Sequence, residues 1–84
     1  MHLSPEAMLE LQKADDFEWA QSAPEVQNNP VHFGKLVVVY KHRIVAVGRD
    51  REAMIAKASQ DVAVPGQHLV VVLVPRPGLW EIPH

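Results

Sequence analysis

Cysteine and threonine are absent from this sequence, and serine is scarce, occurring only as Ser4, Ser22 and Ser59. Without cysteine the chain can form no disulfide, no thiolate metal site and no cysteine nucleophile, and the cytoplasm is the expected compartment. No apolar run approaches the ~20 residues of a membrane-spanning helix, and the first residues lack the basic and apolar regions of a signal peptide. We therefore expect a cytoplasmic protein with no membrane partner.

Basic residues are also few, eight Lys+Arg against ten Asp+Glu, and they are unevenly placed. Residues 1–34 carry six acids and one base, a net charge of −5, whereas residues 35–84 carry seven bases and four acids, a net charge of +3. The opposite signs favour docking of the first part on the second. Nucleic acid is not an expected partner, because binding it needs a dense basic stripe with stacking aromatic residues.

A length of 84 residues corresponds to one small domain, and a hydrophobic content of 48% is sufficient for a core. We divide residues 1–84 into a helical arm (1–33), a ββαβ core (34–75) and a proline-rich tail (76–84). The division follows the composition, because the β-branched runs begin after Gly34 and the prolines cluster after the last run.

The arm is predicted to consist of short helical pieces. Ser4 and Pro5 are typical of the first positions of a helix, which we expect over residues 3–14. Asp16 is predicted to cap a second short piece that carries Trp19. Because its large apolar side chains are poorly suited to water, the arm should pack on the core, with Trp19 in that contact.

Two β-branched runs, residues 36–40 and 43–48, predict a hairpin. Pairing Val39 with Ile44 leaves residues 40–43 as the turn. This turn lacks the glycine or Asn-Gly that tight hairpin turns prefer.

Asp50 is a strong N-cap for a helix over residues 51–60, and the apolar run 69–74 predicts a third strand. The fold class is therefore α+β, with a three-stranded sheet and one crossover helix. If the third strand lies beside the first, the strand order is 2-1-3; the alternative order is 1-2-3. We favour 2-1-3, because residues 36–40 form the most apolar strand.

All three predicted strands are apolar on both faces, as the alternating residues Val37, Val38 and Val39 illustrate. A sheet covered on one side only would carry polar residues on the other side. The helix over residues 51–60 covers one face, so the other must be covered by the arm, by the tail or by a second chain. This pattern predicts self-association, with a dimer as the expected homo-oligomer.

Five stretches follow one another in an order that resembles a family of small bacterial and archaeal domains of unknown function: DFEW (16–19), APEV (23–26), FGKLVVVY (33–40), RIVAVGRD (43–50) and LVVVLVP (69–75). In that family a D-[YF]-x-W motif precedes a G-K-x-V-x-V hairpin, a capped helix and a last strand. This chain departs from the family at Leu36, where Trp is usual, and at the Lys41-His42 turn, where the family tends to Asn/Asp-Gly. The resemblance implies a small α+β domain and carries no catalytic residue.

Chemically reactive groups are scattered along the chain. The five histidines lie near the termini, in the turn or beside loops. A metal site would therefore form only if the fold brought His32, His42 or His68 close to other ligands that are distant along the chain. The acidic residues Asp15 and Asp16, with Glu18, are typical of a solvated helix face. We expect no catalytic residue, no cofactor and no metal site.

The tail contains large apolar residues that a free segment does not need. In an extended segment Trp80 and Ile82 point to the same side, so both can enter one apolar groove of this chain or of a second copy. Leu79, Trp80, Ile82 and Trp19 are therefore the candidate contact residues. We expect a non-enzymatic protein-interaction module that self-associates. The alternative is a small regulatory protein of the antitoxin type, which binds a dedicated protein partner through its acidic arm or its tail.

Overall fold

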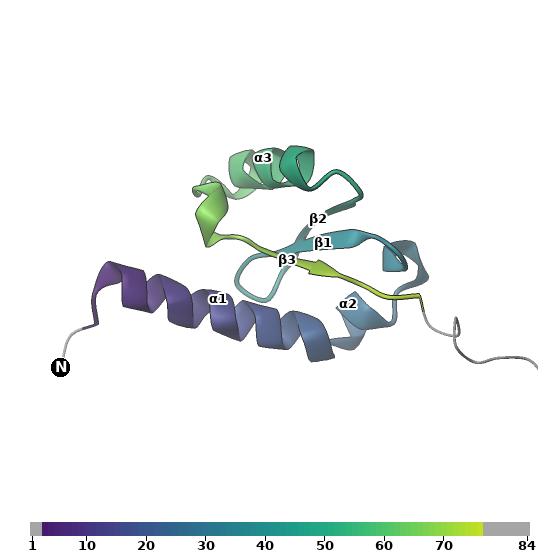
Figure 1. Ribbon diagram of the computed structural model, residues 1–84, viewed down its shortest axis with the longest axis horizontal. Coiled ribbons are helices and arrows are strands. Elements are labelled where there is room, and N and C mark those ends of the chain that lie inside the picture. Colours follow the sequence, from purple (N-terminus) through teal and green to yellow (C-terminus); the bar gives the residue numbers. More distant parts are fainter. Residues whose placement is uncertain (1–2, 77–84) are drawn as a thin grey trace, which may run out of the picture.

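The computed structural model describes residues 3–76, which form two helical layers with a three-stranded sheet between them (Figure 1). Its elements are, in chain order, α1 (Pro5–Ser22), α2 (Pro24–Gln27), η1 (Pro30–His32), β1 (Leu36–Val39), β2 (Ile44–Gly48), α3 (Arg51–Val62), η2 (Gly66–His68) and β3 (Val70–Leu73). This arrangement confirms the expected α+β fold. The tail residues Leu79, Trp80 and Ile82 lie outside the described residues. None of the helices in residues 3–76 combines the length and hydropathy that crossing a bilayer requires.

The strand order is β2-β1-β3 and both pairings are antiparallel, which confirms the 2-1-3 order favoured by the sequence. β1 occupies the centre, where Val37, Val38 and Val39 are fully buried. Their β-branched side chains suit a pleated strand that is covered on both faces. The two edges of the sheet are therefore β2 and β3.

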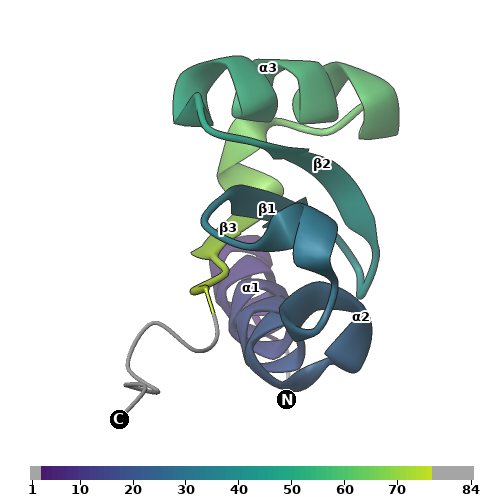
Figure 2. The same cartoon turned by 90° about the vertical axis from the view of Figure 1, so that its right-hand side faces the viewer.

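The arm covers the sheet face that the sequence left unassigned (Figures 1 and 2). On this face Val39 packs with Ala20 of α1 and Val26 of α2. On the opposite face Val38 packs with Met54 of α3. Neither face needs a second chain as its cover, so an argument for self-association has to rest on another surface.

α1 is one continuous helix of 18 residues, and the expected break into two short pieces is wrong. Its start is as expected, because Ser4 Oγ accepts a hydrogen bond from Ala7 N–H at 3.1 Å and Pro5 takes the first helical position. Asp16 lies inside the helix instead of capping a second one. Its side chain is directed at the hairpin, so it does not compete with the helical backbone bonds.

The hairpin turn spans residues 40–43, as expected. Tyr40 N–H donates to Arg43 O at 2.9 Å, and Arg43 N–H donates to Tyr40 O at 3.1 Å. Between them Lys41 and His42 have φ angles of 50° and 58°, as in a type I′ turn. Non-glycine residues carry a conformational cost in this left-handed region, so the turn needs support from elsewhere in the molecule.

A bulge breaks the alternation that the sequence suggested for β2. The β1–β2 register shifts between Val38 and Val39, which leaves Val45 as an extra residue in β2. As a result, Val45 and its neighbour Ala46 both pack in the cluster beneath α3.

α3 begins as expected, with Asp50 Oδ1 accepting a hydrogen bond from Ala53 N–H at 3.2 Å. It continues to Val62, slightly beyond the expected end, and is capped by Ala63 in the left-handed conformation with φ of 57°. The chain then returns to the sheet, where β3 is one residue shorter at each end than the predicted strand.

Candidate interaction surface

The carboxylate of Asp16 joins α1 to the hairpin turn and is only 1% exposed. Its Oδ2 accepts a hydrogen bond from Lys41 N–H at 3.0 Å, and its Oδ1 accepts one from His42 N–H, also at 3.0 Å. The two central amides of the turn thus share a charged acceptor, which makes both bonds strong. The expectation of a solvated position for Asp16 is wrong, because the turn that buries it lies far along the chain.

The side chain of His42 adds two contacts to the same joint. Its Nε2 lies 2.8 Å from Oδ2 of Asp15. Its ring stacks on Trp19, with ring centroids 5.2 Å apart and planes 6° apart. Trp19 also packs against the core cluster beneath α1, which confirms its expected place between arm and core. Its contact with a partner stays a prediction.

The ligand-type atoms of Asp15, Asp16 and His42 all lie within 4.8 Å of one another. Two carboxylates and an imidazole form a donor set that divalent metals accept. Hydrogen bonding inside the cluster already accounts for this geometry, because both oxygens of Asp16 hold backbone amides and His42 is held by Asp15. The absence of a metal site therefore stays a prediction. His32 lies apart from this cluster, with its Nδ1 2.9 Å from Val26 O.

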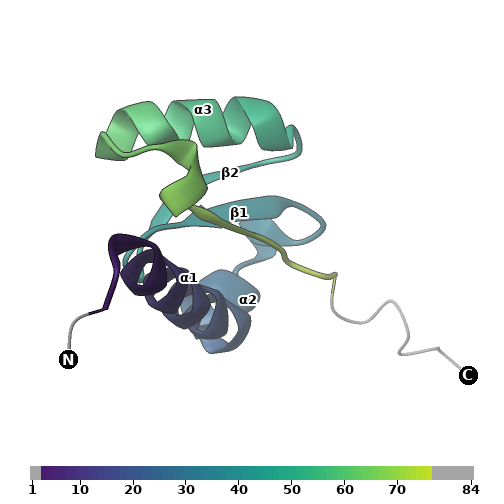
Figure 3. The ribbon, with the colours of Figure 1, turned by 60° about the vertical axis from the view of Figure 1, so that its left-hand side comes forward.

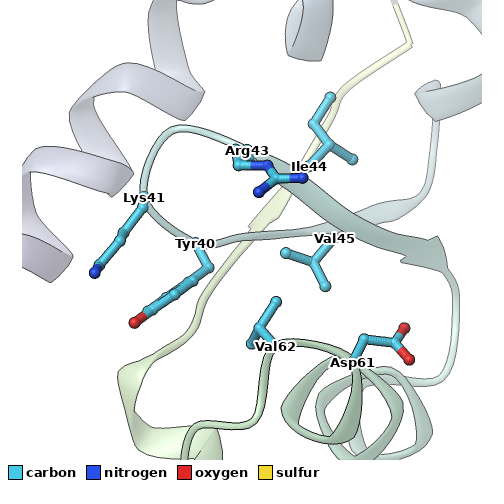
Figure 4. Close-up of a pocket in the computed structure, with 7 residues that line it drawn as sticks. All are labelled: Tyr40, Lys41, Arg43, Ile44, Val45, Asp61 and Val62. Atoms are coloured by element: carbon cyan, nitrogen blue, oxygen red, sulfur yellow. The ribbon is translucent and has the colours of Figure 1, made fainter.

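A pocket of about 470 Å³ opens between the hairpin and the end of α3 (Figure 4). Val45 and Val62 form its apolar middle, and Figure 4 shows Lys41 and Asp61 on opposite sides of it. Ligand sites combine an apolar lining with a few polar groups that converge on one place. The charged groups of this pocket diverge, so we do not assign it a ligand.

The open edge of β3 is a stronger candidate. Gly34 N–H donates to Val74 O at 2.8 Å, and Val74 N–H donates to Lys35 O at 3.0 Å, so the backbone groups of Val74 face β1. Antiparallel pairing alternates inward and outward groups along a strand. The N–H and C=O groups of Val71 and Leu73 therefore face away from β1, on a side where residues 3–76 supply no further strand.

Exposed apolar side chains flank this edge on both faces of the sheet. Leu73 is 60% exposed on the α3 side, and Phe17 of α1 is 49% exposed. Figure 3 shows β3 between these two layers. A groove of about 330 Å³ lies between α1 and the start of the edge, lined by Glu10, Lys13, Ala14 and Phe17 of α1, by Leu69–Val71, and by Arg51 of α3. The four α1 residues share one face of the helix.

The edge formed by β2 differs from the edge formed by β3. The bulge beside Val45 twists β2 and interrupts its pairing, a device that discourages addition of another strand. β3 therefore offers the more accessible template for a further strand.

No match to this chain emerged from comparison with family models, curated proteins and solved structures. The resemblance to small bacterial and archaeal domains of unknown function stays a prediction from the sequence motifs.

Proposed function

We propose that this chain is a non-enzymatic protein-interaction module that self-associates through the open edge of β3. The observation that carries the proposal is the regularity of this edge: the pairing of Val70–Leu73 with β1 has no bulge, whereas the pairing of β2 with β1 has one. Natural proteins use bulges, charged residues and prolines to protect exposed edge strands, because an open edge pairs readily with another strand. The cytoplasm remains the compartment we expect.

A symmetric dimer would satisfy the edge groups of both copies. With a twofold axis beside Val72, Val71 of one copy lies opposite Leu73 of the other, and the two residues exchange hydrogen bonds. The two sheets then form one continuous sheet of six strands. Leu73 would lose much of its exposed surface, a gain of about 1–2 kcal/mol per copy.

The serine hydroxyls support the non-enzymatic part of the proposal. Each bonds to nearby backbone: Ser4 caps α1, Ser22 Oγ donates to Glu18 O at 3.1 Å, and Ser59 Oγ donates to a carbonyl just after α3. A hydroxyl nucleophile needs an adjacent general base. The arrangement of these three hydroxyls is that of structural caps.

Light scattering on the full chain tests the proposal. We expect the average mass to rise from 9.4 kDa toward twice that value as the concentration reaches tens of micromolar. Leu73→Lys places a charge beside the open edge and should hold the protein at the monomer mass. Leu11→Lys is the matched control, because Leu11 is 59% exposed on α1 and does not line the groove.

The proposal fails if the full chain stays at 9.4 kDa throughout this range, or if both lysine variants change the mass alike. Circular dichroism of each variant should show the fold retained. A loss of association that accompanied unfolding would say nothing specific about the edge, so the comparison is made at a temperature where all three proteins are folded.

A second candidate function is binding of a dedicated protein partner through the arm. Met8 and Leu11 are each 59% exposed, and they lie one helical turn apart on the flank of α1 away from the β3 groove. With the acidic residues of the arm they form a surface suited to a partner with an apolar, basic site. Met8→Ser with Leu11→Ser should abolish copurification with the product of a neighbouring gene while leaving self-association unchanged.

A further inference from the structure

We infer that the dimer proposed above has a second layer, in which the α1 helices of the two copies pack together and restrict the β3 edge to a second copy of this chain. The inference rests on the proposed function, because the helices meet only when the two β3 edges pair. It adds the feature that selects the partner, since an open edge by itself pairs with any strand.

The groove of about 330 Å³ between α1 and β3 opens at the edge of the sheet. Among residues 3–76 its walls come from α1, from the first residue of α3 and from the start of β3, and none comes from β1 or β2. A hollow that touches both helical layers and the edge strand alone opens past that strand. Whatever pairs with β3 therefore comes to lie beside this flank of α1.

Pairing of the two β3 strands places both α1 helices on one face of the joined sheet. The twofold axis of an antiparallel strand pair stands perpendicular to the sheet, so it exchanges the two copies without exchanging the faces. Figures 1 and 2 show α1 beneath β3, and in Figure 1 the two elements run in the same general direction. The second α1 therefore lies antiparallel to the first, on the same side of the sheet.

Helices in these positions come into contact, because they are wider than the strands above them. Paired strands lie about 4.8 Å apart, whereas a helix with its side chains is about 10–12 Å across. α1 packs against β1 as well as β3, so its axis is displaced inward from the edge. A displacement of about half a strand spacing in each copy separates the two axes by about 10 Å, and packed helices are typically about 8–10 Å apart.

The flank of α1 beside the groove suits a helix–helix contact. Its members follow the i, i+3, i+4, i+7 spacing of one helix face: Glu10, Lys13, Ala14 and Phe17. Phe17 is 49% exposed and supplies the apolar area, and the small side chain of Ala14 allows close approach. The charges of Glu10 and Lys13 balance one another, so two copies of the flank meet without net repulsion.

This second layer distinguishes a second copy from other partners. A lone strand that pairs with β3 brings no helix with it and leaves Phe17 in contact with water. A different domain brings its own covering layer to this face, and that layer clashes with α1 unless the two shapes match. A twofold copy presents the same flank, so a match is built into the symmetry.

Crosslinking of single-cysteine variants tests the contact, because the chain has no cysteine of its own. We expect Phe17→Cys to form a covalent dimer with a short bismaleimide at a concentration where the unmodified chain has doubled its mass. Leu11→Cys is the matched control, since Leu11 is 59% exposed on α1 and does not line the groove. It should crosslink at least about tenfold more slowly, because its cysteines are not held together.

An affinity measurement supplements the crosslink. Phe17→Ala should raise the dissociation constant of the dimer by about tenfold, because buried aromatic side chains supply much of the binding energy of an interface. Leu11→Ala should change it by less than about twofold, as is usual for a surface substitution. Light scattering over a dilution series gives both values, at a temperature where circular dichroism shows each variant folded.

The outcomes separate this inference from the proposed function. If the chain doubles its mass but the two cysteine variants crosslink alike and Phe17→Ala associates normally, the helix contact is overturned and the proposed function stands. Leu73→Lys added to Phe17→Cys should abolish the crosslink. A crosslink that survives this change would show that α1 pairs without β3, and the proposed edge would fail. A mass that stays at 9.4 kDa would overturn both.

Discussion

The carboxylate of Asp16, in the interior of α1, accepts a hydrogen bond from the backbone N–H of His42 at 3.0 Å, across 26 residues of chain. The other oxygen holds the neighbouring amide of Lys41 at the same distance. One buried side chain thus closes the hairpin turn and docks the helix beside it. Since the arm covers one whole face of the sheet, this joint connects the two parts of the fold.

Replacing Asp16 should therefore destabilise the protein more than any other change to its acidic residues. Asp16→Ala leaves two turn amides without their acceptor and should lower the free energy of unfolding by about 2–4 kcal/mol. Asp16→Asn keeps one acceptor oxygen and should lose about half as much. Urea unfolding at neutral pH measures both values. Asp15→Asn, at a side chain that is 70% exposed, is the control and should cost less than about 1 kcal/mol.

The turn residues should respond to substitution according to their positive φ angles. Lys41→Asn introduces a residue that tolerates φ of 50° and should stabilise the protein by about 0.5 kcal/mol. Lys41→Val introduces a β-branched side chain that avoids this region and should destabilise it by about 1–2 kcal/mol. Thermal unfolding of the two variants compares them directly. Equal melting temperatures would show that the backbone at Lys41 differs from the described geometry.

The stack between Trp19 and His42 should contribute a measurable pairwise energy. Trp19→Leu and His42→Ala, singly and together, form a double-mutant cycle. We expect a coupling energy of about 0.5–1.5 kcal/mol, which is typical of aromatic pairs in contact. Additive effects of the two substitutions would mean that the rings do not stack in solution.

The end of α3 offers a pair of opposite predictions. Ala63→Gly relieves an alanine at φ of 57° and should stabilise the protein by about 0.5–1 kcal/mol. Gly66→Ala should destabilise it by about 1–3 kcal/mol, because the new Cβ would lie 2.7 Å from Cγ2 of Ile55. Chemical denaturation of both variants measures the change in the free energy of unfolding, which should be positive for Ala63→Gly and negative for Gly66→Ala. A neutral Gly66→Ala would indicate that Ile55 moves freely in its packing.

Local sequence signals were sufficient for most of the secondary structure. The β-branched runs predicted all three strands, Asp50 predicted the start of α3, and the pairing of Val39 with Ile44 predicted the turn. These features depend on residues that are neighbours along the chain, so their energies can be judged from the sequence. The break expected before Asp16 was wrong because a capping residue was inferred from its type, while its actual partners were not visible.

The assembled sheet decided which strands lie at its edges. It also decided which backbone N–H and C=O groups of an edge strand face outward. The apolar sequence of β1 favoured its place at the centre of the sheet. Because all three strands are apolar on both faces, however, the sequence did not identify the segment that covers the face opposite α3. The bond from Asp16 to His42 and the packing of Ala20 on the sheet hold the arm in place. Both join residues that are distant along the chain, and closing such a loop costs entropy that local sequence preferences do not reveal. Only the folded chain places Asp15 beside His42 and leaves the backbone groups of Val71 and Leu73 pointing outward, because both arrangements arise from contacts between segments that are distant in sequence.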